Sequence, residues 1–218
     1  MSRPGRSPLP RPSALLLDAM GTLIHLRRPL GQTYAAAANR HGIEVEAAAI
    51  DRHFPAVLRA APPLAFPGLD GEELAEAELQ WWGNRIEEVL QAAGHGEAPE
   101  ALRRELFEEF ADPSLWFVHD EVRHWLERWH GRGLRMAVVS NFDSRLHGLL
   151  EGLGLNRWLE VVVVSSRAGA AKPSPKPFRL ALEQLGVPPR QAWHIGDSPE
   201  DVEGACAAGL QPILLRRP

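Results

Sequence analysis

The chain has 218 residues, 44% of them hydrophobic and 24% charged, which is typical of a globular protein with room for one core domain and one insertion. Its formal net charge is −4, and without the three Arg of residues 1–13 it is −7, so no binding of nucleic acid is expected. No apolar run approaches the roughly 18 residues of a membrane-spanning helix, so no membrane contact is expected.

The first segment, residues 1–13, is rich in Arg and Pro and contains no acidic residue. It lacks the apolar stretch of about 7 to 15 residues that a secretory signal needs, so we expect a disordered tail. Cys206 is the single cysteine, which rules out an internal disulfide and favours a cytoplasmic location. Its small neighbours predict a thiol packed in the core.

The tail is followed by a short apolar run, residues 14–17, that ends at Asp18 and is followed by Gly21 and Thr22. This pattern predicts a buried parallel strand and its turn. The next stretch is helical almost throughout, and its apolar spacing and glycine stops predict helices over 31–40, 46–60, 72–93 and 99–110. Short connections between amphipathic helices predict a bundle of antiparallel neighbours.

Strands and helices alternate in the rest of the chain. Strands are predicted over 134–139, 161–164, 192–195 and 212–215, and helices over 121–130, 144–153, 177–185 and 200–208. This alternation indicates an α/β fold, a doubly wound, Rossmann-like parallel sheet, with the helical bundle inserted after the first strand. We therefore predict a core domain formed by residues 14–25 and 113–218 and a helical cap formed by residues 26–112.

Polar residues gather where the predicted strands end. The set comprises Asp18, Ser140 with Asn141, Lys172, and Asp197 with Asp201. In open parallel sheets, ligands bind outside the carboxyl ends of the strands, so we expect these side chains to meet there. Together they supply a carboxylate nucleophile, hydroxyl and amide donors, an ammonium group and further carboxylates for a hard cation. Phosphoryl transfer through a covalent aspartyl intermediate needs this set of groups.

Lysine is rare in this chain, which has 22 Arg and only two Lys, Lys172 and Lys176. A compact ammonium group differs from a guanidinium in geometry and hydration, so the retained Lys172 favours a functional role. Lys176 begins a predicted helix, where we expect it on the surface.

Four segments of the chain resemble the four motifs of the haloacid dehalogenase superfamily. They are LLLDAMGTL, VVSN, AAKPSPKPF and HIGDSPEDVEGACAAG, in family order and at similar spacing. The helical insertion lies where that family places its type-one cap. The resemblance covers about residues 14 to 215.

The resemblance implies a role for each matching residue. Asp18 is similar to the nucleophile, Ser140 to the phosphate-binding hydroxyl with the Asn141 amide beside it, and Lys172 to the lysine that neutralises the nucleophile and the transferred group. It also implies Mg²⁺ as cofactor, held by Asp18, the backbone carbonyl of Met20, Asp197 and Asp201. Oxygen ligands of this kind suit Mg²⁺.

Met20 is the departure from the family pattern, because phosphatases of that family usually carry a second Asp at this position as general acid and base. A thioether cannot shuttle a proton, and a missing acid or base costs on the order of 10²- to 10⁴-fold in rate. His25 and His194 are the nearest candidates in sequence to replace it.

The predicted function is a Mg²⁺-dependent phosphatase that acts on a small phosphorylated metabolite through an aspartyl phosphate, as a monomer or homodimer. Met20 leaves two alternatives open: a non-catalytic protein that binds a phosphorylated ligand, and a metal-independent 2-haloacid dehalogenase, which segment one also resembles. Asp197 and Asp201 argue against the dehalogenase, since two carboxylates that face Asp18 without a cation would repel it.

The predicted cap contains Trp81, Trp82 and Arg85 on one helix. These side chains either line a substrate pocket or pack in the interior of the cap, and a Trp pair at helical spacing more often belongs to a core.

Overall fold

The computed structural model describes residues 11–217. Most of the predicted tail, residues 1–10, lies outside the described residues. Ser13, which the sequence places in that tail, already belongs to the core, because its N–H donates to the Gln191 carbonyl (2.8 Å) and its carbonyl accepts from the Arg135 N–H (3.1 Å).

The elements follow one another along the chain with bounds close to the predicted ones. The strands are β1 (Ala14–Leu17), β2 (Ile24–Leu26), β3 (Trp116–Val118), β4 (Arg135–Ser140), β5 (Val161–Val164), β6 (Ala192–Gly196) and β7 (Gln211–Leu214). The helices are α1 (Leu30–Arg40), α2 (Ala47–Ala60), α3 (Gly71–Ala92), α4 (Glu100–Glu109), α5 (Asp120–His130), α6 (Arg145–Gly152), α7 (Ser165–Ala168), α8 (Lys176–Leu185) and α9 (Pro199–Ala208). Short 3₁₀ turns occupy Pro113–Leu115, Asn156–Trp158 and Pro189–Gln191.

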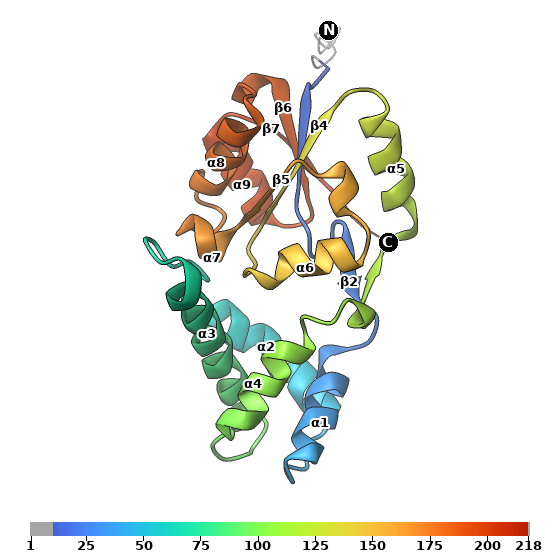
Figure 1. Ribbon diagram of the computed structural model, residues 1–218. Helices are drawn as coiled ribbons and strands as arrows, with labels where there is room; N and C mark the ends of the chain where they lie inside the picture. The colour runs from blue at the N-terminus through green and yellow to red at the C-terminus, as the bar shows by residue number, and fades with distance from the viewer. Residues whose placement is uncertain (1–10, 218) are drawn as a thin grey trace, which may run out of the picture.

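The core is a five-stranded sheet in the order β5-β4-β1-β6-β7, and all four strand pairs are parallel. The central strand β1 is wholly buried, as a strand covered on both faces must be. Helices α8 and α9 cover one face and α5 and α6 the other, and each pair buries its own apolar cluster against the sheet (Figure 1). The predicted doubly wound α/β fold is confirmed.

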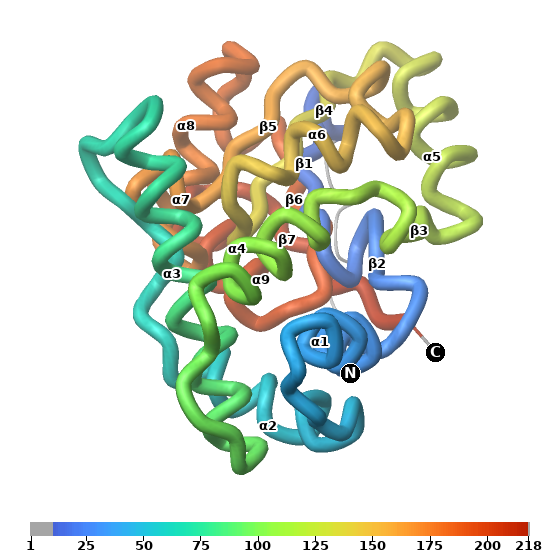
Figure 2. Tube along the Cα trace, turned by 60° about the horizontal axis from the view of Figure 1, so that its bottom comes forward, coloured from blue at the N-terminus to red at the C-terminus, as the bar shows by residue number. Residues whose placement is uncertain are grey.

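Helices α1 to α4 form a separate bundle beyond the carboxyl ends of the strands (Figures 1 and 2). The bundle has its own apolar core, to which all four helices contribute, with Tyr34, Ile50, Leu90 and Leu106 among its buried residues. It is inserted between β2 and β3. The bundle, called the cap below, therefore lies over the edge of the sheet at which the predicted site residues end their strands.

Two strands and one helix were not predicted from the sequence. β2 and β3 form a two-stranded antiparallel sheet in which His25 is opposite Phe117, and α7 is a single helical turn. Segments of three or four residues carry too little periodicity to be recognised. The two strands that pair, β2 and β3, are also separated in the sequence by all four helices of the cap.

Two surface predictions have different outcomes. Lys176 is exposed at the start of α8, as predicted. Cys206 is exposed on α9, so the prediction of a packed core thiol is wrong; the buried residues of that helix are Asp201, Gly204, Ala205 and Ala208. None of the helices over residues 11–217 combines the length and apolar composition needed to cross a membrane.

Candidate active site

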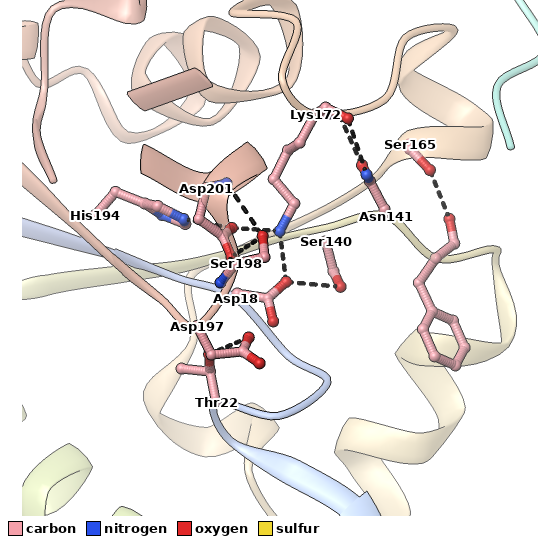
Figure 3. Close-up of polar contacts among 11 residues, drawn as sticks. Asp18, Thr22, Ser140, Asn141, Ser165, Lys172, His194, Asp197, Ser198 and Asp201 are labelled. Atoms are coloured by element: carbon pink, nitrogen blue, oxygen red, sulfur yellow. Dashed lines mark hydrogen bonds and ion pairs between the residues drawn. The ribbon is translucent and has the colours of Figure 1, made fainter. Parts of the chain in front are cut away.

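Asp18 follows the last residue of β1 and lies at the centre of a buried polar cluster (Figure 3). Its backbone N–H donates to the Ile195 carbonyl of β6 (2.9 Å), which continues the strand pairing through the residue. The residue is only 5% exposed. Its Oδ1 accepts hydrogen bonds from Lys172 Nζ (2.5 Å) and Ser140 Oγ (3.2 Å). The structure thus brings together three of the predicted residues, two from the ends of β1 and β4 and one from the loop before α8.

Asp18 Oδ2 contrasts with Oδ1, since it accepts no hydrogen bond from residues 11–217. One carboxylate oxygen is therefore held in place by an ammonium and a hydroxyl group, and the other is free. An aspartate nucleophile needs this combination of a fixed orientation and a free oxygen.

Lys172 lies in the loop between α7 and α8 and joins two carboxylates. Its Nζ donates to Asp18 Oδ1 and to Asp201 Oδ1 (2.6 Å), and its side chain is almost completely buried. A buried ammonium group is tolerated because both of these partners are anionic. The geometry agrees with the predicted neutralising role of Lys172.

Asn141 was predicted to place its amide beside the phosphate. In the structure its Nδ2 donates to the Lys172 carbonyl (3.0 Å) and its Oδ1 accepts from the Lys172 N–H (2.7 Å). Both polar atoms of the side chain are therefore engaged with the backbone of Lys172. The residue links the end of β4 to the loop that carries the lysine.

Asp201 is 1% exposed in the first turn of α9, where both of its oxygens accept hydrogen bonds. Oδ1 accepts from Lys172 Nζ and contacts His194 Nε2 (2.9 Å), while Oδ2 accepts from the N–H (3.1 Å) and Oγ (2.8 Å) of Ser198. Ser198 and Asp201 form a reciprocal capping box for the helix. The predicted metal ligand is thus also the residue that orients Lys172.

His194 was a candidate replacement for the missing acid. It lies on β6, is fully buried, and packs edge-on against Phe178 of α8 at a ring distance of 4.8 Å. Its Nε2 is bonded to Asp201, and its Nδ1 has no partner among the described residues. A side chain enclosed between the sheet and α8 does not reach a leaving group, so His194 supports Asp201 instead.

Asp197 differs from the other two acids because it is exposed. Its Oδ1 accepts a hydrogen bond from Thr22 Oγ1 (3.3 Å), which links the ends of β6 and β1. Gly21 beside it has φ +82°, and a Cβ at that position would lie 2.3 Å from Asp197 Oδ2. Only glycine allows the turn and the carboxylate to approach so closely.

Ligand oxygens of Asp18, Asp197 and Asp201 all lie within 4.8 Å of one another. Lys172 pairs with two of these three carboxylates, so the cluster carries excess negative charge, which a divalent cation would neutralise. An all-oxygen donor set also suits Mg²⁺. The residues present therefore fit the cofactor that the sequence implied.

The charges in this cluster change one another's protonation. Burial raises the pKa of Asp18, Lys172 opposes this rise, and Asp201 adds to it. Burial acts to lower the pKa of Lys172, but Asp18 and Asp201 outweigh it and hold the pKa above its usual value. Burial acts to raise the pKa of Asp201, but the hydrogen bond with His194 and the charge of Lys172 outweigh it and hold the pKa below its usual range. Lys172 therefore remains an ammonium group and Asp201 a carboxylate.

Met20 is half-buried in the turn after β1 and bridges to Ile24. Its side chain packs against the apolar cluster between the sheet and α5 and α6. His25, the other candidate acid, is exposed on β2, where its ring lies beside Phe117 and its Nδ1 contacts the Leu26 carbonyl (3.3 Å). Neither residue hydrogen-bonds to the described acidic cluster.

A second buried polar cluster, between cap and core, was missed by sequence reasoning. It consists of Glu78, Trp82, Asp143, Ser144 and Arg145. The overlooked signal was Glu78, which lies four residues after Leu74 on the buried face of α3, where an apolar residue is expected.

Trp81, Trp82 and Arg85, the cap residues considered for a substrate pocket, have different surroundings in the structure. Trp81 packs inside the cap, with its Nε1 donating to the Pro62 carbonyl (3.1 Å) and the Arg85 guanidinium over its ring (5.2 Å). Trp82 faces the core, and its Nε1 donates to Asp143 Oδ2 (2.6 Å).

Comparisons with known proteins agree with this architecture. A bovine (Bos taurus) protein described as haloacid dehalogenase-like hydrolase domain-containing protein 3 is 38% identical over 207 residues, which cover 94% of this chain and 82% of that protein. A phosphoserine phosphatase of Thermus thermophilus is 34% identical over 146 residues, 65% of this chain and 59% of that enzyme. A solved structure described as a predicted phosphoglycolate phosphatase from Haemophilus somnus has a TM-score of 0.67 at 17% identity, with 93% of this chain and 84% of that one covered.

The solved structures with this fold include both phosphatases and dehalogenases, so the fold alone does not separate the two activities. The family model of haloacid dehalogenase-like hydrolases matches residues 12–209, which include both the strand-end cluster and the cap. The chain therefore belongs to the haloacid dehalogenase-like hydrolase family.

Proposed function

We propose that this protein is a Mg²⁺-dependent phosphatase that hydrolyses a small phosphorylated metabolite through an aspartyl phosphate. The observation that carries the proposal is the arrangement around Asp18. Lys172 and Ser140 hold its Oδ1, Oδ2 accepts no hydrogen bond from residues 11–217, and the exposed Asp197 lies beside it as a further oxygen ligand. The phosphoserine phosphatase that is 34% identical over 146 residues supports the same reading.

Each residue has a defined part in the proposed reaction. Asp18 Oδ2 attacks phosphorus, and the bond from phosphorus to the leaving oxygen breaks. Lys172 and Ser140 already face Asp18 and stabilise the charge on the transferred group. Asp18, Asp197 and Asp201 would hold Mg²⁺. When bound, the cation supplies positive charge for the phosphoryl oxygens. Water then cleaves the aspartyl phosphate and regenerates Asp18.

Protonation of the leaving group is the weak step. The Met20 thioether has no proton to donate and His194 is enclosed, so neither delivers a proton to the leaving oxygen. Substrates whose leaving group departs as a stable anion avoid this step. We therefore propose that the enzyme is slow on alkyl phosphates and faster on phosphates with acidic leaving groups.

Met20 also favours a second candidate, a non-catalytic protein that binds a phosphorylated ligand with the same groups. The dehalogenase hypothesis is weaker, because Asp197 and Asp201 lie within 4.8 Å of the nucleophile and would repel it without a cation.

The test is hydrolysis of an aryl phosphate with and without Mg²⁺, by the wild type and by Asp18→Asn. Asp70→Asn is the matched control, since Asp70 is exposed and its side chain makes no capping hydrogen bond. We expect Mg²⁺-dependent phosphate release that Asp18→Asn abolishes and Asp70→Asn preserves. A folded wild type without turnover, but with measurable phosphate binding, would overturn the phosphatase in favour of the binding protein.

A further inference from the structure

Arg145, the first residue of α6, reaches out of the core and into the cap. Its Nη1 donates to the Phe107 carbonyl of α4 (2.6 Å), and its guanidinium lies 3.9 Å from the centre of the Phe107 ring. The Trp82 ring of α3 lies 5.3 Å from the same group. A core side chain is thus held between two cap helices by one hydrogen bond and two cation–π contacts.

Asp143 lies beneath this arginine and is completely buried. It receives two parallel hydrogen bonds from Arg145, Nε to Oδ1 (2.8 Å) and Nη2 to Oδ2 (2.7 Å). The Trp82 indole N–H donates to the same Oδ2 (2.6 Å). Because a buried carboxylate is strongly disfavoured without such partners, the position of residues 143–145 depends on a donor that belongs to the cap.

Glu78 adds a second link from the cap. It is buried on α3, and its Oε1 accepts from the N–H (3.0 Å) and the Oγ (2.7 Å) of Ser144 at the start of α6. Ser144 itself makes no side-chain capping bond to its own helix. A carboxylate at this place also interacts favourably with the positive end of the helix. The cap therefore supplies an anion that stabilises the N-terminus of a core helix, beside Asp143 of the core, which accepts from the Arg145 N–H.

A short loop, residues 140–145, connects these contacts to the phosphate site. Residues 143–145 begin two residues after Asn141, which holds the backbone of Lys172, and three after Ser140, which holds Asp18. A shift of this loop therefore displaces both the hydroxyl and the lysine that face the nucleophile.

We propose that Trp82 and Glu78 are positioning residues, through which the docked cap fixes loop 140–145 and thereby Ser140 and Lys172. The inference rests on the proposed function for its effect on activity, but the geometry of the loop is testable without activity. It assigns the cap a part in building the phosphate site, in addition to covering it.

The first test compares Trp82→Phe with Trp81→Phe. Both remove one indole N–H, but Trp81 donates inside the cap and Trp82 donates to the core. Amide hydrogen exchange is followed at Lys172, whose N–H is bonded to Asn141 and touches neither tryptophan. We expect Trp82→Phe to accelerate exchange at Lys172 about tenfold and to weaken binding of inorganic phosphate about as much, with Trp81→Phe changing neither.

The second test compares Glu78→Gln with Glu88→Gln. Glu88 is exposed and pairs with Arg85 of the same cap helix, away from the core, and serves as the control. We expect faster exchange at Lys172 in Glu78→Gln alone and, on an aryl phosphate, a larger rise in KM than fall in kcat. Unchanged exchange at Lys172 in both Trp82→Phe and Glu78→Gln would overturn the proposal. Equal acceleration in the control variants would do the same, since it would indicate general loosening. If the wild type shows no turnover, the proposed function fails, but the exchange result still decides this inference.

Discussion

The side-chain amide of Asn141 and the backbone of Lys172 exchange two hydrogen bonds, 3.0 and 2.7 Å long, between segments 31 residues apart in the chain. A pairing of this kind resembles one rung of a sheet formed by a side chain. The two bonds hold the backbone of Lys172, and with it the position from which the ammonium group contacts Asp18. Asn141 therefore acts on the site through Lys172.

The first prediction concerns this pairing. Asn141→Ala removes both hydrogen bonds and is expected to lower kcat/KM on an aryl phosphate by about tenfold or more, since two partly buried backbone groups of Lys172 lose their partners. Asn156→Ala, at an exposed asparagine, is the control and should leave the rate unchanged. Steady-state kinetics decide the matter, and equal rates for Asn141→Ala and wild type would show that Lys172 needs no such support.

The second prediction concerns Mg²⁺. Asp197 is the exposed member of the acidic cluster, so Asp197→Asn is expected to raise the Mg²⁺ concentration for half-maximal activity by about tenfold or more. Glu200→Gln, at an exposed acid three residues further on in the first turn of α9, should have no such effect. Mg²⁺ binding measured by calorimetry provides a readout besides activity. Unaltered Mg²⁺ affinity in Asp197→Asn would contradict the proposed metal site.

The third prediction restores the missing acid. Met20→Asp is expected to raise kcat on alkyl phosphates by on the order of 10²-fold, because the new carboxyl group protonates a poor leaving group. Aryl phosphates should respond little, since their leaving groups need no proton. Met20→Asn is matched in size and cannot titrate, so a gain in that variant would show that the effect is not proton transfer. The measurement is the dependence of rate on leaving-group pKa.

The fourth prediction is a pH dependence of stability. Burial lowers the pKa of His119, and the charge of Arg217 adds to this effect. A histidine with a lowered folded-state pKa binds fewer protons than in the unfolded chain, so its contribution is fully present above the unfolded value of about 6.5 and is lost as the pH falls below it. Thermal unfolding between pH 7 and pH 5 should therefore show a smaller loss of stability for His119→Gln than for wild type.

The control for the pH experiment is His124→Gln, because His124 is exposed on α5, the helix that His119 precedes. It should follow the wild-type profile. A His119→Gln profile parallel to that of wild type would mean that another group causes the pH dependence. The expected difference is small, since the burial of His119 is partial.

Local pattern predicted the principal elements because each extends over several residues. The run over 14–17 is apolar on both faces, and the long helices of the cap have regular apolar spacing, so each carries its own signal. Their observed bounds differ from the predicted ones by at most one residue, as fraying and capping allow. β2 and β3 were missed because their three-residue segments are stabilised only by pairing with each other.

The sequence by itself determined the identity and order of the strand-end residues, and hence the family and the doubly wound core. Only the tertiary structure decided which partner each polar group takes: Asn141 pairs with Lys172, and Asp201 joins Lys172 to His194. It alone revealed that Trp82 meets Asp143, 61 residues further along the chain. The physical reason is that hydrogen bonds between distant segments depend on how whole elements pack, whereas strand and helix patterns depend on neighbours within a few residues.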